Sequence, residues 1–219
     1  MKKIITLVSA IMFISSQAFA FEGFSVGATY SSIDFSTTGS ESSNNDGGAA
    51  EIATTTKTGS AEIGSIFAEY TFSQGTTIGI EAIQGSAEIG KASRTSSTPS
   101  GTVTAKATAK NPVTLYVEPT WMANEKFGIY VKGGVTSVTI SPSETDSASV
   151  TTSTYNDKDV YGVMTGIGAK YYINNFFVKA EYVETDYGKY SHTSTTGDKN
   201  TITADVDTEE TRISIGYNF

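Results

Sequence analysis

The sequence of 219 residues contains no cysteine, a single histidine and only four prolines. The absence of cysteine excludes a disulfide framework, a cysteine-ligated metal and a cysteine nucleophile. One histidine excludes a metal site built from several histidines. Basic residues number 15 against 23 acidic ones, which argues against a nucleic-acid partner, because phosphate binding needs clustered lysine and arginine. No apolar run after residue 20 reaches the roughly 18 residues that a transmembrane helix needs.

The first 20 residues have the features of a secretory signal peptide. Two lysines follow the first residue, residues 4–16 are mostly apolar, and residues 18–20 read Ala-Phe-Ala, an A-x-A cleavage site. An apolar N-terminal strand or anchor helix is the alternative, but the basic start and the small residues favour the signal. We therefore expect residues 1–20 to be removed and residues 21–219 to form one exported domain.

After the signal, apolar and polar residues alternate in short stretches rich in Gly, Ser and Thr. Alternation with period two is typical of strands in a sheet with two unlike faces. The clearest stretch places Leu115, Val117 and Trp121 on one face, and Tyr116 and Glu118 on the other. The pattern predicts eight strands near residues 23–35, 62–72, 77–89, 113–122, 127–140, 160–171, 176–187 and 205–219.

Short and long connections alternate between these strands. The second, fourth and sixth connections are tight turns, whereas the others are long and polar. The long ones cover about 37–60, 90–111, 141–158 and 188–204. Outer-membrane barrels show this asymmetry, with short periplasmic turns and long external loops. We therefore predict an all-β fold: an eight-stranded antiparallel up-and-down transmembrane β-barrel with four long external loops and three short periplasmic turns.

Glycines and aromatic residues indicate which of the two faces points into the barrel. A soluble barrel such as a lipocalin also alternates, with its apolar face inside. Here the polar face is rich in glycine, which weakens an exposed strand but suits the crowded interior of a small barrel. Aromatic residues of the apolar face gather beside the short turns and the C-terminus, where a membrane-interface ring is expected. They are Phe72, Trp121, Phe127, Tyr171, Phe176, Tyr217 and Phe219. We therefore place the apolar face toward lipid.

Two strands depart from the simple alternation. The first changes phase after Tyr30, where Ile33 and Phe35 replace the even-numbered apolar set, which predicts a bulge or the end of the membrane-spanning part. Pro119 interrupts the fourth strand and loses a ladder hydrogen bond, which predicts a bulge near the periplasmic rim.

The face predicted to line the lumen carries four acids and four bases. They are Glu69, Glu81, Glu118, Lys132, Lys170, Lys179, Glu181 and Arg212. The fourth and fifth strands place Glu118 opposite Lys132. If Phe72 pairs with Ile78, the second and third strands place Glu69 opposite Glu81. Two facing carboxylates repel each other, so they need a cation such as Arg212. Side chains just fill the interior of an eight-stranded barrel, so we expect an ion-paired plug rather than a narrow wet pore. A third option puts some of these charges above the membrane.

The start and the end of the mature sequence resemble a known class. Residues 21–30 follow the signal directly, and the last strand alternates apolar residues up to a terminal phenylalanine: Ile213, Ile215, Tyr217 and Phe219. With the inward charges, these features resemble small eight-stranded outer-membrane barrels of the OmpA transmembrane-domain and opacity-protein type. The resemblance implies location in the outer membrane of a Gram-negative-type bacterium. It also implies a C-terminal signal read by the barrel-assembly machinery, and a structural, adhesin or pore role.

A plugged lumen leaves function to the loops. The second long loop is basic, with Lys91, Arg94, Lys106 and Lys110 and no acid between residues 91 and 111. Such a loop suits lipopolysaccharide phosphates or an anionic partner, although small polar residues also suit a solvated, mobile loop. We predict a structural or surface-interaction protein that contacts outer-membrane lipid, lipopolysaccharide and an unidentified extracellular ligand. A narrow porin-like channel for ions or small solutes is the alternative.

The third hypothesis about function is an enzyme that modifies lipid A. His192-Thr193-Ser194 matches the His-x-Ser pair of a lipid A deacylase family, with Glu184 or Asp207 to orient the histidine. That family's flanking Asn-Ala-Gly is absent, the segment falls in a predicted loop, and three-residue matches are common. We therefore predict no catalysis, no cofactor and no metal site.

Overall fold

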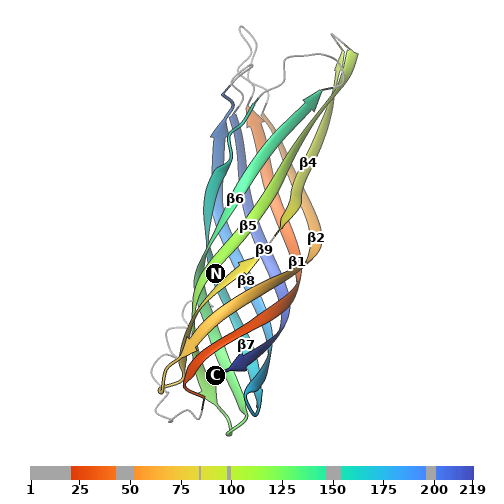
Figure 1. Ribbon diagram of the computed structural model, residues 1–219. Helices are drawn as coiled ribbons and strands as arrows, with labels where there is room; N and C mark the ends of the chain where they lie inside the picture. Colours follow the sequence, from red (N-terminus) through yellow and green to blue (C-terminus); the bar gives the residue numbers. More distant parts are fainter. Residues whose placement is uncertain (1–20, 43–51, 84, 98–99, 147–153, 196–200) are drawn as a thin grey trace.

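The structure is a computed structural model that describes residues 21–42, 52–83, 85–97, 100–146, 154–195 and 201–219. The predicted signal peptide lies outside these residues. Nine antiparallel strands form one ring-like sheet (Figure 1). They are β1 (Gly23–Ser42), β2 (Ile52–Thr71), β3 (Thr76–Ile83), β4 (Ser86–Ser97), β5 (Ser100–Met122), β6 (Phe127–Asp146), β7 (Lys158–Ile173), β8 (Phe176–Thr193) and β9 (Thr201–Asn218). Among these residues no helix has the length and apolarity to cross a membrane.

The ring closes at both ends of the chain, which confirms the predicted all-β barrel fold. β1 pairs with β2 on one side and with β9 on the other. The remaining strands follow in order to β5, and β3 pairs with both β2 and β5. Closure leaves no open edge in the part of the wall that β3 completes, as lipid requires.

The third predicted strand is two strands, which is why nine are present instead of eight. β3 and β4 are separated near Gly85, whose φ of 131° favours glycine. β5 responds with a register shift between Lys110 and Val113, next to Asn111 at a φ of 45°. β3 and β4 therefore share β5 as partner and together occupy one strand position in the barrel wall.

Most of the described residues in the four predicted long loops belong to strands instead. β1 and β2 stay paired up to Ser42↔Ile52, and β4 and β5 up to Ser97↔Ser100. The Ser/Thr-rich segments extend strands already held in the wall, so each further residue gains ladder hydrogen bonds without a new loop closure. Hydroxyl pairs across strands add to this, such as Thr193 with Thr201 at 2.9 Å.

Turn geometry decides two register predictions differently. Trp121 pairs with Ile129, as predicted. The pairing of Phe72 with Ile78 was wrong, because the Phe72 amide donates to the Thr76 carbonyl in a tighter turn and Ile78 pairs with Tyr70 instead. Glu81 therefore lies opposite Phe67, and Glu69 opposite Gly79. The pairs on either side of Pro119 keep one register, so no bulge forms there.

In the lower half of the barrel, near the short turns, apolar side chains point outward. Leu115 on β5 is 61% exposed and Ile213 on β9 is 64% exposed, whereas the residues directly before and after each of them are buried. A face of this kind would be unstable in water and is what hydrocarbon stabilises. The predicted aromatic positions lie along its lower rim, where the Tyr217 ring packs edge-on against both Phe176 and Phe219.

Inward aromatics in this half lie opposite glycines on the neighbouring strand. Phe67 pairs with Gly27, Tyr116 with Gly79, Tyr130 with Gly168 and Phe177 with Gly216. A Cβ on Gly216 would approach Phe177 Cζ to 2.2 Å, far inside van der Waals contact. The glycines therefore make the room in which the large side chains fill the lumen.

In the upper half the polarity of the two faces is reversed. β1 continues to Ser42 without a bulge, so Ile33 and Phe35 point into the barrel while Asp34 points out. β9 shows the same change between outward Ile213 and inward Val206. The phase change after Tyr30 therefore marks the upper edge of the membrane-spanning part, where the outside becomes wet and the inside becomes apolar.

Candidate functional site

A network of buried charges crosses the lumen in the lower half of the barrel. All eight charged residues predicted there lie inside, each at most 5% exposed. Glu118 on β5 is fully buried and meets three lysines. Its carboxylate lies 3.1 Å from Lys132 Nζ, 3.0 Å from Lys179 Nζ and 3.6 Å from Lys170 Nζ. These lysines come from β6, β8 and β7, so one carboxylate on β5 connects four strands through ion pairs across the interior.

A second carboxylate completes this lysine cluster. Glu69 on β2 accepts from Lys179 Nζ at 2.5 Å and from Lys170 Nζ at 3.2 Å. The phenol of Tyr116 donates to it at 3.0 Å. Sequence reasoning missed Tyr116, although it lies on the inward face of β5 by alternation. Burying charge is costly unless each group is paired and hydrogen-bonded, a condition that this cluster meets.

The second group of charges surrounds Arg212 on β9. Its guanidinium is bonded to Glu81, which also accepts from the Ser65 hydroxyl. Arg212 Nε lies 3.7 Å from Glu210, a residue missed by the sequence reasoning although it shares the inward phase of Arg212. Glu181 joins the two groups, 2.9 Å from Lys132 Nζ and 4.0 Å from Arg212 Nε.

Aromatic packing closes the lumen below the charges. Phe67, Tyr172 and Phe177 form a buried cluster on β2, β7 and β8. Phe21 stacks on Tyr172 with ring centroids 3.9 Å apart. The interior of the lower half is therefore filled by two layers, one of aromatic rings and one of ion pairs above it.

Above the charges lies an apolar chamber of about 580 Å³, which we call the upper chamber. Its aliphatic and aromatic lining includes Ile33, Phe35, Ile63, Val138, Ile140 and Val206. Glu210 also lines it, so the Arg212 group forms its floor. The sequence analysis did not predict this chamber. These six residues fell in predicted strands, but other parts of its wall, such as Lys57, Lys106 and Tyr190, were treated as loops.

Comparison with known proteins agrees with this architecture. Residues 5–219 match the family model of the outer membrane protein beta-barrel domain. The chain belongs to this family. No curated protein matches the sequence. Among solved structures, it is similar to the outer membrane protein OprG from Pseudomonas aeruginosa, with 15% identity, coverage of 94% of this chain and 99% of that one, and a TM-score of 0.60. It is also similar to AlkL in lipid bilayers, with 15% identity, coverage of 93% of each chain and a TM-score of 0.53.

The predicted C-terminal assembly signal lies on the lipid face of this outer-membrane barrel. Ile213, Ile215, Tyr217 and Phe219 all point outward, and Phe219 is 71% exposed. The amide of Phe219 donates to the Phe24 carbonyl at 3.0 Å, so the last residue is fixed to the first strand. The pattern is thus present in the folded wall as an exposed apolar row.

The predicted basic loop is a strand hairpin. Lys91 lies opposite Lys106 on β4 and β5, and Arg94 pairs opposite Val103 through its backbone. Lys106 lies 3.5 Å from Glu88, and Lys110 lies 3.5 Å from Asp157. Part of the basic charge is therefore neutralised by exposed carboxylates.

His192 and Ser194 of the His-x-Ser match are not hydrogen-bonded to each other among the residues that the structure describes. His192 Nε2 and Ser194 Oγ are both buried, and neither has a hydrogen-bond partner in the described part of the chain. The His192 ring lies between Tyr155 and Tyr190, with centroid distances of 6.1 Å to each. Glu184 lies on the outer face, opposite Glu209. Among the described residues no set of three or more potential ligands is arranged for a metal.

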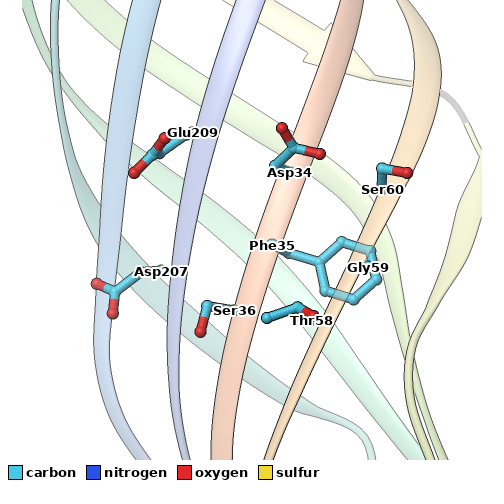
Figure 2. A pocket seen from close by; sticks show the side chains of 8 residues that line it. All are labelled: Asp34, Phe35, Ser36, Thr58, Gly59, Ser60, Asp207 and Glu209. Carbon is cyan, nitrogen blue, oxygen red and sulfur yellow. The ribbon is translucent and has the colours of Figure 1, made fainter.

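Carboxylates gather on the outer face just above the lipid-facing part. Asp34 on β1 lies opposite Glu209 on β9, and Asp207 lies opposite Asp186 on β8. Figure 2 shows Asp34, Asp207 and Glu209 around a shallow pocket beside Phe35. Partial burial raises the pKa of Asp207, and the charges of Asp186 and Asp205 raise it further.

Replacing Asp207 with asparagine is expected to stabilise the barrel at neutral pH. The pKa of Asp207 is raised above its usual 3.8 in the folded protein, so the folded state holds this proton more tightly than the unfolded chain. Stability therefore falls as the pH rises from about 3.8 through the raised pKa. Urea unfolding of Asp207→Asn against wild type should show a gain of up to about 1 kcal/mol at pH 7 that vanishes toward pH 3.5. A gain independent of pH would contradict the charge explanation.

Proposed function

We propose that this protein is an outer-membrane barrel with a blocked lumen that acts through its external half, in a structural or surface-interaction role. The observation that carries the proposal is the full burial of Glu118 among three lysines from three other strands. A hydrated ion crossing the lumen would have to separate these pairs and the aromatic rings below them. Breaking one side of a buried pair costs about 3–5 kcal/mol, which disfavours a standing path.

The two outer surfaces support the partners that we propose. Outer-membrane lipid covers the apolar lower half, and the barrel-assembly machinery reads the C-terminal strand during insertion. We assign the basic hairpin that carries Lys91, Arg94, Lys106 and Lys110 to contact with lipopolysaccharide phosphates. The long strand hairpins, opacity-protein-like in placement, present a polar surface to an extracellular ligand. Their regular pairing supports contact through a rigid edge instead of a mobile loop.

The absence of cysteine allows a direct test by single-cysteine labelling. Val138→Cys places a thiol in the upper chamber, and Thr77→Cys places one on the fully buried inner face near the short turns. The barrel is inserted in vesicles with its hairpins facing a small charged thiol reagent, and their orientation is checked by protease cleavage. We expect Val138→Cys to react and Thr77→Cys to stay unlabelled until urea unfolds the barrel.

Equal labelling rates at the two positions would overturn the blocked lumen and favour the porin-like alternative. A matched control is Thr139→Cys, on the outer face where the native hydroxyl donates to the exposed Asp159 at 2.7 Å, which should react whether or not the lumen is blocked. Failure of this control would show that the hairpins face the wrong side.

A further inference from the structure

We propose that the upper chamber binds a single-chain anionic amphiphile, such as a fatty acid, with the chain inside and the acid group at the rim. This goes beyond the blocked lumen and does not depend on it, because the chamber lies above the charged network. The inference rests on three observations: the reversed polarity of the upper wall, the volume of the chamber, and two lining lysines that have no ion pair with any described residue.

The lining is apolar where a water-filled vestibule would be polar. Val138, Ile140 and Tyr190 are at most 8% exposed and pack together, with Ile89 and Val160 against them. Ile33, Phe35 and Ile63 are only partly covered and face the free volume. Apolar surface facing water is unfavourable, so an apolar chain in this space would stabilise the folded upper half.

The chamber has the size of a small-molecule site. Its volume of about 580 Å³ falls within the range of roughly 300–1,000 Å³ that such sites occupy. The floor carries Glu210, beside Arg212, which prevents a long chain from passing deeper. An acid group would be repelled from this floor carboxylate, which leaves the rim as its position.

The rim carries cations that suit an acid group. Lys57 on β2 and Lys91 on β4 both line the chamber and are exposed. Neither has a carboxylate within 4.0 Å in the part of the chain that the structure describes, whereas the nearby Lys106 is paired with Glu88. Two unpaired ammonium groups beside an apolar space distinguish an anionic amphiphile from a neutral hydrocarbon.

The wall beside these lysines is not sealed by backbone hydrogen bonds. β3 ends its pairing with β2 at Ser65↔Ile83, and β2 beyond this point pairs with β1 alone among the described residues. β4 pairs only with β5 among the same residues. Ile66 and Ile80, just below this break, point outward and are about half exposed. The chamber therefore borders the outer edge of the lipid-facing surface, which gives an amphiphile dissolved in the membrane a route into it.

Fluorescence quenching by a brominated amphiphile tests the proposal in lipid nanodiscs. Trp121, the single tryptophan, points outward at the lower rim and reports probe dissolved in the bilayer. The variant Trp121→Phe/Tyr190→Trp moves the reporter into the chamber; the Tyr190 hydroxyl has no described partner to lose. We expect 12-bromododecanoate to quench the chamber reporter saturably, at concentrations that leave wild-type Trp121 bright. If this variant does not insert, Trp121→Phe/Phe35→Trp replaces it.

The lysines decide the chemical class. Lys57→Gln/Lys91→Gln in the reporter background should weaken 12-bromododecanoate about three- to tenfold, since exposed ion pairs are individually weak. It should leave 12-bromododecanol unchanged. Quenching that rises linearly and in parallel at both reporters would overturn the site. Equal binding of acid and alcohol, unaffected by the lysine variant, would overturn the anionic class. Conductance of the wild type is a separate measurement, so this proposal and the blocked lumen fail independently.

Discussion

Substituting Glu118 with alanine is expected to lower the stability of the barrel by about 3–5 kcal/mol. Glu118 is fully buried and lies within 3.6 Å of the ammonium groups of Lys132, Lys170 and Lys179. Its removal leaves Glu69 and Glu181 to balance three buried lysines. The charge imbalance and the cavity both lower stability, because the three lysines stay buried with too few carboxylates and the space left by the side chain is lined by packed residues.

Urea unfolding in lipid vesicles measures this loss through the fluorescence of Trp121, the single tryptophan of the chain. The matched control is Glu88→Ala, which removes a carboxylate 3.5 Å from Lys106 where both side chains are 40% or more exposed. Exposed pairs contribute about 0–1 kcal/mol, so the control should unfold almost like wild type. Similar losses in the two variants would contradict the buried network.

The second large effect is expected at Gly79, where valine should cost about 3 kcal/mol. A Cβ there would approach Tyr116 Cζ to 2.3 Å. Tyr116 packs against Met164 and Val183 and donates to Glu69, so its ring moves only by breaking that packing and the hydrogen bond. Steric overlap at one glycine is thus transmitted to the charged network.

Gly133→Val is the matched control for this substitution. No atom outside its own chain neighbours lies within 4 Å of a Cβ built on Gly133. Valine favours strands over glycine, so this variant should be neutral or slightly more stable. The same urea titration compares the two, and a stable Gly79→Val barrel would show that Tyr116 does not fill the lumen as described.

Much of the fold is readable from alternation, because lipid outside and a crowded lumen inside impose opposite residue types on the two faces. Leu115 and Glu118 were assigned to their faces by parity alone, and the inward charges follow the same rule. The register at Phe72 was not readable, since a shift of two residues preserves every face assignment. Only the turn hydrogen bond from the Phe72 amide to Thr76 separates the two registers.

The upper half was misread for a different reason. Its Ser/Thr content suggested loops, yet the sequence carries a signal of strand continuation. Apolar residues change phase between Tyr30 and Ile33 in β1, and between Val206 and Ile213 in β9. Such a switch at matching heights in neighbouring strands indicates a wall that passes from lipid to water with its polarity reversed. The same parity rule applied to Glu210 would have completed the Arg212 group.

Single-channel recording of residues 21–219 in planar bilayers shows whether paired charges close the lumen. Wild type, Glu118→Ala and Arg212→Ala are recorded side by side under the same voltage. A lumen blocked in this way gives a silent wild type, with openings only in variants that break the network. Steady openings of the wild type whose conductance changes in either variant would contradict the account and make the charged lumen a conduction path.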